Sequence, residues 1–287
     1  MPNFADKLHL LVDSIDFFVY IFFVNPLVVT YFIHKFADRM KYVALPVSSH
    51  TVCQSSTGLT NGVRRLSFYL AMEEYVARCI DEPDCFFLWQ VRPTVIFGRN
   101  QVMQNEVNID YCREQGIEMY RRKSGGGCVY ADEGNIMLSF VTHSEDVPYT
   151  FNRFIGMLLL VLRRLGLEAV GTEHNDVLID GHKVSGTAFY HLPGRSIVHS
   201  TLLYDTNMQH MLSAITPPAE KLQAKGIESV RQRITFLKDY ISMGIDELKA
   251  FIRQTLCNGE LLLTTDDVAA IEQLEKEYLD SKFIQKM

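Results

Sequence analysis

The stretch over residues 120–140, YRRKSGGGCVYADEGNIMLSF, has the residue types that bind an anion. Arg121, Arg122 and Lys123 run directly into Ser124 and three consecutive glycines at 125–127. Three glycines in a row are entropically costly in a regular element, so they favour a loop that passes close to a ligand. Backbone N–H groups beside cationic side chains bind phosphate or carboxylate. The stretch therefore predicts an anion site.

A second group of candidate residues lies about 50 residues later, in the segment NDVLIDGHKVSGTAFY over residues 175–190. Asp180-Gly181 predicts a tight two-residue turn between two strands. Lys183 follows that turn and could hold a carboxylate or an α-phosphate as a point charge, or it could be a solvated strand residue. Small residues at 185–188 would let a ligand approach. Asn175 and Asp176 could orient a sugar, a metal ion or the lysine, or could form a polar turn.

Several common catalytic patterns are missing from the sequence. It contains no G-x-S-x-G elbow, no metal-spaced histidine cluster, no phosphate-binding P-loop and no kinase signature. The two candidate segments also offer no nucleophile paired with a base. The chemistry that they favour is electrostatic stabilisation and positioning, as in phosphoryl or adenylyl transfer.

Composition narrows the class of protein. The chain has 287 residues, of which 47% are hydrophobic and 22% charged, as in an ordinary globular protein. A net charge of −6 leaves no basic excess for a general nucleic-acid binder. Six scattered cysteines form no CxxC pair, which indicates reduced thiols and a cytoplasmic protein.

The first 39 residues differ from the rest. Residues 8–32 are almost continuously apolar, over a length near the roughly 20 residues of a membrane span. A membrane-anchoring helix is one interpretation. The other is that the natural protein starts at Met40 and that the extension is translated upstream sequence. We expect one catalytic domain to fill residues 40–287.

The apolar periodicity predicts a mixed α/β domain. We expect strands at 41–47, 136–142 and 196–204, and helices at 66–80, 108–115 and 151–165. Apolar runs at 85–90 and 94–98 predict a hairpin, and residues after Pro218 are expected to be mostly helical.

Several motifs, in the right order over residues 40–240, resemble one family. RRKSGGGCVYADEGN resembles the RRxSGGGxVxHDxGN signature of lipoate–protein ligases and lipoyltransferases. NDVLIDGHKVSGTAFY is similar to their ND…GxKxSGxA segment, SIVHSTLLYDTNM to their HHGTLL strand, and KGIESVRQRITFL to their KGIxSVRxR stretch. FYLAMEEYVA and FLWQVRPTVIFGRNQ fit their first helix and hairpin. The resemblance implies the biotinyl/lipoyl protein ligase catalytic domain, a class II synthetase-like α/β (α+β) fold with a mixed sheet flanked by helices.

The resemblance also implies an activity: lipoate and ATP give lipoyl-AMP, and the lipoyl group passes to a lysine of carrier domains in 2-oxoacid dehydrogenases or the glycine cleavage H protein. Lys183 would be catalytic and contact both the lipoate carboxyl group and the α-phosphate. Asp176 would help to place Mg²⁺, and Trp89, Lys183 and His199 would bind lipoate. Val95, Phe97 and Val129 are further candidate walls or core residues. The adenylate would be held by Arg122, Ser124, Gly125, Gly126, Gly127, Cys128, Val129, Tyr130, Asn175, Asp176 and Lys183.

The chain departs from the family pattern at two positions. Ala131 replaces the histidine after the glycine loop, and Ser200 replaces a glycine, which predicts a weakened site. Glu73 and Glu74 could simply form the polar face of a helix. The C-terminal accessory domain of long bacterial ligases is expected to be absent, so a separate accessory subunit is one possibility.

Four alternatives to a stand-alone ligase remain open. The first is a lipoyltransferase that uses preformed lipoyl-AMP, and the second is an octanoyltransferase acting through Cys128. The third is a biotin ligase, although its glycine loop has a different pattern. The fourth is a membrane-tethered binding protein built on an inactive ligase fold.

Overall fold

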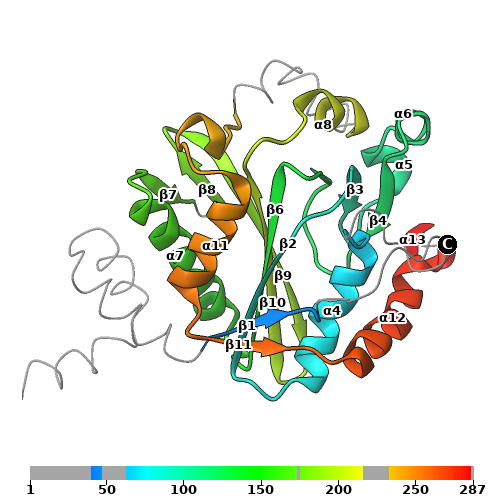
Figure 1. Cartoon of the computed structure of the whole chain (residues 1–287). Coiled ribbons are helices and arrows are strands. Elements are labelled where there is room, and N and C mark those ends of the chain that lie inside the picture. The colour runs from blue at the N-terminus through cyan, green and yellow to red at the C-terminus, as the bar shows by residue number, and fades with distance from the viewer. Residues whose placement is uncertain (1–39, 47–62, 173–174, 216–232, 286–287) are drawn as a thin grey trace, which may run out of the picture.

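Two β-sheets form the framework of the protein. The computed structural model describes residues 40–46, 63–172, 175–215 and 233–285 (Figure 1). Eight strands form a mixed sheet in the order β11-β1-β2-β6-β10-β9-β8-β7, and three form a second sheet in the order β4-β3-β5. The strands are β1 Met40–Ala44, β2 Asp84–Trp89, β3 Thr94–Phe97, β4 Glu118–Arg121, β5 Val129–Ala131, β6 Asn135–Thr142, β7 Ala169–Gly171, β8 Asp176–Ile179, β9 His182–Leu192, β10 Arg195–Leu203 and β11 Gly259–Leu262.

Helices cover both faces of the large sheet, as Figure 1 shows. Alternate residues of β6 enter different cores: Met137 and Val141 join one core, while Leu138 and Phe140 join the other. The first core includes α4 (Leu66–Cys79) and α12 (Thr265–Leu279), and we call its side the α4 face. The second core includes α7 (Val147–Arg164) and α11 (Ile245–Leu256). Strand β6 is buried along its whole length, so both of its faces are covered.

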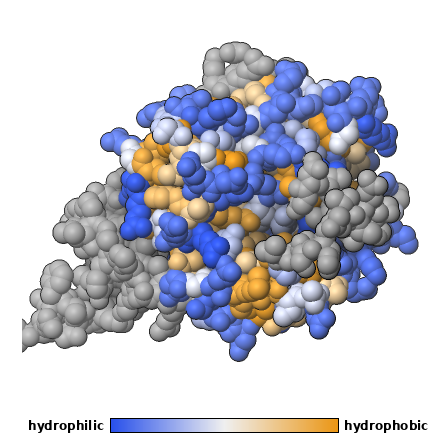
Figure 2. All heavy atoms as spheres, viewed as in Figure 1, coloured by the Kyte–Doolittle hydropathy of each residue, from blue (hydrophilic) through white to orange (hydrophobic). Residues whose placement is uncertain are grey.

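The small sheet has a core of its own. Val95 and Phe97 of β3 and Tyr130 of β5 pack there with residues from α5 (Met103–Glu106), α6 (Ile109–Glu114) and α8 (Met208–Ala214). Asn108 caps α6, accepting a hydrogen bond from the backbone N–H of Tyr111. A 3₁₀ turn η1 (Leu237–Asp239) and a short helix α13 (Ser281–Gln285) complete the described elements. The face shown in Figure 2 is mostly hydrophilic, with separate apolar areas, consistent with apolar cores between the layers.

Most of the expected elements are confirmed, and the predicted hairpin at 85–98 is wrong. Strands β2 and β3 do not form a hairpin, because β2 pairs with β1 and β6 whereas β3 pairs with β4 and β5. The short Arg92-Pro93 connection carries the chain from one sheet to the other. The described part of the C-terminal region is mostly helical, as expected, and it adds one short strand, β11, which pairs in parallel with β1. The apolar segment 8–32 lies outside the described residues.

Candidate active site

The glycine loop is held in place by Arg122 and by a close backbone approach. Arg122 Nη2 donates to the carbonyl oxygens of Gly125 and Gly127 at 2.7 Å each, and Nη1 donates to Ile96 O at 3.1 Å. A Cβ at Gly98 would lie 2.2 Å from Gly126 O, and Gly126 itself has a φ of +89°. Glycine is therefore required at both positions to let the loop pack against β3.

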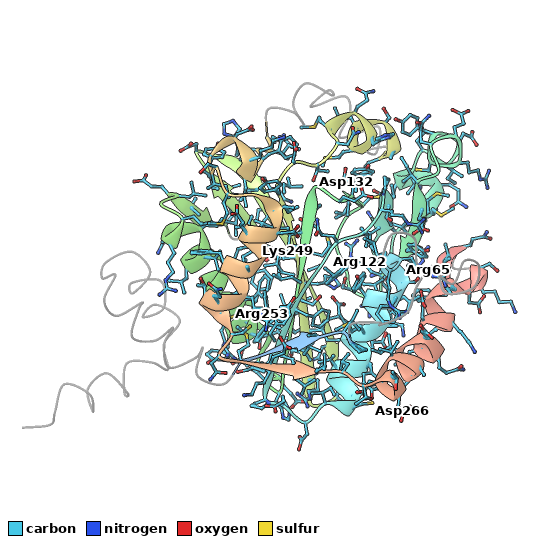
Figure 3. All side chains as sticks on the ribbon, viewed as in Figure 1. Arg65, Arg122, Asp132, Lys249, Arg253 and Asp266 are labelled. Carbon is cyan, nitrogen blue, oxygen red and sulfur yellow. The ribbon has the colours of Figure 1, made fainter. Side chains whose placement is uncertain are left out.

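Arg122 brings an uncompensated positive charge to this loop, and Figure 3 labels its side chain in the interior of the molecule. Its guanidinium is 5% exposed, and all its hydrogen-bond partners are main-chain carbonyls. Burial lowers the pKa of Arg122 to about 10, so the group remains charged at neutral pH. Over the described ranges, no carboxylate pairs with it. A buried cation without a counterion favours an anionic ligand nearby.

Gly125 and Gly127 lack side chains for a different reason. A Cβ at either position would meet nothing within 4 Å, and neither has a positive φ. Neither packing within the described part of the chain nor backbone strain therefore requires glycine here. Glycine beside open space leaves the backbone bare, which lets a ligand approach its N–H groups closely. The loop has the features of the predicted anion site, although only Arg122 of the three cations contacts it.

Lys183 lies on the α4 face of the large sheet because of a β-bulge. Paired residues of adjacent strands point to the same face, and the register runs Asp176–Gly186–Thr201 across three strands. Thr201 is two residues from His199, so this row shares the face of His199. Residue 183 is three residues from Gly186, so regular alternation would place its side chain on the face opposite His199. The bulge skips one residue of β9, because Val177 pairs with Ser185 and Leu178 with Lys183. Lys183 therefore lies on the α4 face, with its Nζ 2.8 Å from Asp176 Oδ1.

The turn before Lys183 has the predicted form. Asp180 and Gly181 have φ values of +49° and +76°, as the two central residues of a type I′ turn require. Asn175 also has a positive φ, of +70°, and its backbone oxygen accepts a hydrogen bond from the N–H of Thr187. Asn175 is exposed and directly precedes Asp176, so both predicted polar residues lie at the start of β8.

A buried hydrogen-bond network joins the glycine loop to the large sheet. Trp89 Nε1 donates to Ser139 Oγ at 2.8 Å, and this hydroxyl donates to Glu73 Oε1 at 2.5 Å. His199 Nδ1 lies 3.0 Å from Glu73 Oε2, and its Nε2 lies 2.7 Å from Ser124 Oγ. A carboxylate can only accept, so Nδ1 donates to Glu73, and in the neutral ring Nε2 accepts from Ser124. Trp89 and His199, both predicted to bind lipoate, thus belong to one network.

The network corrects two interpretations of the sequence. Glu73 and Glu74 are 3% and 2% exposed, so they do not form a solvated helix face. Helical spacing already places Glu73 on the apolar stripe with Leu70 and Ala77, a signal that sequence analysis missed. The sequence also indicated no nucleophile paired with a base, but Ser124, His199 and Glu73 are hydrogen-bonded in series, as a serine nucleophile, its base and a carboxylate would be. Ser124 is only 2% exposed, which favours a positioning role for its hydroxyl.

The other residues considered for the wall of the lipoate site differ in their burial. Val95 and Phe97 are fully buried in the small-sheet core, whereas Val129 and Cys128 are partly exposed. Trp89 stacks on Tyr69 at 4.8 Å between ring centroids. The side chain of Tyr130 is buried, so this residue offers a ligand only its backbone, on the edge strand β5.

The two departures from the family pattern have structural explanations. Ala131 is fully buried in the core on the α4 face, so it fills space there. The Ser200 hydroxyl lies 2.7 Å from Ser185 Oγ. Ser200 follows His199 directly, so its side chain points to the opposite face of the sheet. Its Cβ therefore does not occupy the space in front of His199.

We expect Ser200→Gly to lower stability without raising turnover. The lost hydrogen bond costs about 1 kcal/mol and glycine in a strand about 0.5–1 kcal/mol. Urea unfolding and a lipoylation assay measure the two effects. Ser196→Gly is the matched control, because Ser196 is also buried on β10 and donates to Ser144 O. A several-fold gain in turnover for Ser200→Gly alone would show that the serine obstructs the site.

The described residues contain neither a membrane-spanning helix nor a metal-binding cluster of side chains. Within them, no helix is long and apolar enough to cross a membrane. The same residues contain no group of three or more histidine, cysteine, aspartate or glutamate side chains placed to hold a metal ion.

Comparison with known proteins identifies relatives of the chain. Lipoate-protein ligase LplJ of Bacillus subtilis is 35% identical over 72% of this chain and 66% of its own length. Lipoate–protein ligase 1 of Staphylococcus aureus is 32% identical over 76% of this chain and 69% of its own. The chain thus spans about two thirds of the length of these curated relatives.

Solved structures of related proteins confirm the fold. A bi-partite lipoate protein ligase from Thermoplasma acidophilum superposes with a TM-score of 0.71 at 25% identity, covering 86% of this chain and 95% of its own. A lipoate-protein ligase A bound with ATP gives 0.69 at 23% identity, over 86% and 98% of the two chains. The predicted mixed sheet flanked by helices is therefore confirmed. A family model described as the lipoyl protein ligase A/B catalytic domain matches residues 66–257, and the chain belongs to this family.

Proposed function

We propose that this protein is a lipoate–protein ligase, which activates lipoate with ATP to lipoyl-AMP and transfers the lipoyl group to a carrier lysine. The observation that carries the proposal is that this chain has both the glycine loop with its buried arginine and a lysine on the α4 face. A glycine loop is held open by a buried, uncompensated arginine, and Lys183 is turned onto the α4 face. The resemblance of the whole motif set and the relatives named above support the same activity.

The proposal gives each group a part in two steps. In the first, a lipoate carboxylate oxygen attacks the α-phosphorus of ATP, and pyrophosphate leaves. In the second, the amine of a carrier lysine attacks the carbonyl carbon of the mixed anhydride, and AMP leaves. Arg122, Ser124 and the backbone of residues 125–130 bind the adenylate. Lys183 neutralises charge on the carboxylate and the α-phosphate in both steps. Trp89 and His199 line the lipoate site.

We also propose that the protein binds Mg²⁺, to which it would contribute a single carboxylate ligand. Mg²⁺ is commonly bound by one or two carboxylates together with substrate phosphates and waters. Asp176 fits this pattern as a single carboxylate, although its Oδ1 is engaged by Lys183 at 2.8 Å. The ion would reduce the repulsion between the carboxylate and the phosphates. Asp176 itself orients the ammonium group of Lys183, and Asn175 precedes it at the start of β8.

The proposed partners are lipoyl carrier domains of 2-oxoacid dehydrogenase complexes and the glycine cleavage H protein. The bi-partite ligase of Thermoplasma acidophilum was described together with its E2 lipoyl domain, which supports this class of partner. It also supports a separate accessory subunit as part of the proposal. A cytoplasmic location is favoured by the five free cysteines of the described residues, Cys79, Cys85, Cys112, Cys128 and Cys257.

Incubation with ATP, Mg²⁺ and lipoate, followed by measurement of pyrophosphate, tests the activation step. A purified lipoyl domain, analysed by mass spectrometry, tests the transfer. Release of pyrophosphate and a mass gain of one lipoyl group are expected. Transfer from synthetic lipoyl-AMP without pyrophosphate release would instead identify a lipoyltransferase, or a ligase that needs an accessory subunit. Failure of both steps would overturn the proposal.

Cys128 provides a test of the octanoyltransferase alternative. Burial raises the pKa of its thiol to about 12, so at neutral pH the group is protonated and a poor nucleophile. We expect Cys128→Ser to retain acyl transfer to within about threefold, as a near-isosteric change at a position packed against the small-sheet core. Cys112→Ser, in the same core, is the matched control. Loss of transfer only in Cys128→Ser would favour a cysteine thioester.

A further inference from the structure

The three consecutive cations before the glycine loop hold two different parts of the molecule. Arg122 holds the loop itself, whereas Arg121 and Lys123 hold the C-terminal helices. Arg121 is 2% exposed, and its Nε donates to the carbonyl oxygens of Phe283 and Ile284 in α13, at 3.0 Å each. The sequence predicted an anion site beside all three cations, and in the structure Arg121 directs its Nε and Nη1 to main-chain carbonyls outside the glycine loop.

Arg121 also reaches the segment that supports the glycine loop. Its Nη1 donates to the carbonyl oxygens of Gly98, Arg99 and Gln101, at 3.1, 3.1 and 2.7 Å. Gly98 is the residue that packs directly against Gly126. The N–H of Arg99 donates to Ser124 O at 2.9 Å. One guanidinium therefore joins α13 to the segment on which the loop rests.

Lys123 makes a second connection to the same helices. Its Nζ lies 2.8 Å from Glu277 Oε2 on α12 and 2.8 Å from Glu74 Oε1 on α4. It also lies 4.9 Å from the centre of the Tyr278 ring. Figure 1 shows α12 and α13 beside α4 and β4. The two connections meet the chain on either side of Arg122, so a shift of the C-terminal helices would displace residues 121 and 123 together.

We propose that Arg121 and Lys123 are positioning residues that couple the seating of α13 to the nucleotide affinity of the glycine loop. The inference rests on the proposed function, which assigns the nucleotide to that loop. Coupling between two sites is reciprocal. ATP bound at the loop therefore stabilises α13 in its seat, and a poorly seated α13 weakens ATP binding. The lipoate site, which includes Trp89 and His199, is linked to the loop through the hydrogen bond between His199 and Ser124, so lipoate affinity should change less than ATP affinity.

Arg121→Lys in the full chain is the main test, because an ammonium retains the charge but cannot bridge both segments. We expect the KM for ATP to rise on the order of tenfold, within the usual range of coupling between sites. Hydrogen–deuterium exchange should increase at residues 98–101, 124–128 and 281–285. Adding ATP should slow exchange at 281–285 in the wild type but not in the variant. The KM for lipoate should change less than the KM for ATP.

Arg64→Lys is the matched control, since Arg64 pairs with Glu272 on α12 at 2.7 Å without contacting the loop segment. It should leave the KM for ATP and loop exchange unchanged. If Arg121→Lys does not fold, Glu277→Gln removes one partner of Lys123 at a half-exposed position and should give a smaller change in the same direction.

The inference and the proposed function fail in different ways. Faster exchange at α13 alone, with the loop and the KM for ATP unaltered, would overturn the inference and leave a purely structural anchor. Absence of ATP binding in the wild type would overturn the proposed function. The coupling is then decided without ATP, by whether Arg121→Lys increases exchange at residues 124–128.

Discussion

Lys183→Ala is expected to reduce lipoylation of a carrier domain by a factor on the order of 10²–10³, the usual loss when one group that stabilises transition-state charge is removed. If Lys183 acts in the transition state, kcat and kcat/KM should fall together. The fold should be preserved, because the Lys183–Asp176 pair is about one-third exposed and such pairs contribute about 0–1 kcal/mol. The backbone contacts of Lys183 with Arg233 and Thr235 remain in the variant.

Lys238→Ala is a matched control for this experiment. Lys238 makes the same type of ion pair, with its Nζ 2.6 Å from Asp205 Oδ2, at a more exposed position outside the proposed site. Its removal should leave both turnover and thermal unfolding close to the wild type. Steady-state lipoylation kinetics and calorimetry distinguish the two variants. Full activity in Lys183→Ala would contradict the assigned site.

Gly127→Ala should have the second large effect, on ATP alone. The added methyl group meets nothing within 4 Å in the described structure, and the backbone has no positive φ. Alanine at such a position is expected to leave stability equal or raised by about 0.4–1 kcal/mol. A methyl group in the path of a phosphate should raise the KM for ATP by about 10- to 100-fold, because misplacing a reacting group by 1 Å costs on that order.

Alanine substitutions at two other glycines serve as comparisons for Gly127→Ala. Gly244→Ala is the control, since its Cβ would make an ordinary contact of 3.5 Å with Glu247 Oε2 at the start of α11. It should leave the KM for ATP unchanged. Gly98→Ala should instead lower the melting temperature, because its Cβ would lie 2.2 Å from Gly126 O. An unchanged KM for ATP in Gly127→Ala would exclude close phosphate approach at that residue.

Local features of the chain were predictable where local chemistry determines them. Asp180-Gly181 specified a tight turn, and its positive φ values confirm it. The glycine loop was predicted because few structural roles suit three adjacent glycines. The helix that contains Glu73 was also predicted. The burial of Glu73 was not, because the partners that satisfy its carboxylate, Ser139 and His199, lie 66 and 126 residues away.

Long-range pairing explains the wrong hairpin and the strand that was not predicted. Strands β2 and β3 are adjacent in sequence and apolar, so nothing local distinguishes a hairpin from two strands in different sheets. Strand β11 is only four residues long and forms because β1 offers a parallel edge more than 200 residues away. The different tasks of Arg121 and Arg122 follow from their long-range partners: Arg121, the last residue of β4, contacts α13, whereas Arg122, just after the strand, contacts the glycine loop.

The β-bulge between β8 and β9 makes the length of this hairpin a functional property. One residue inserted or deleted between Lys183 and Gly186 would exchange the face on which the ammonium group of Lys183 emerges. Side chains there can vary in type as long as the number of residues stays constant. Natural variation in this hairpin should therefore consist of substitutions rather than insertions or deletions. The same hairpin is for this reason a poor place to insert a peptide tag, even though its turn is exposed.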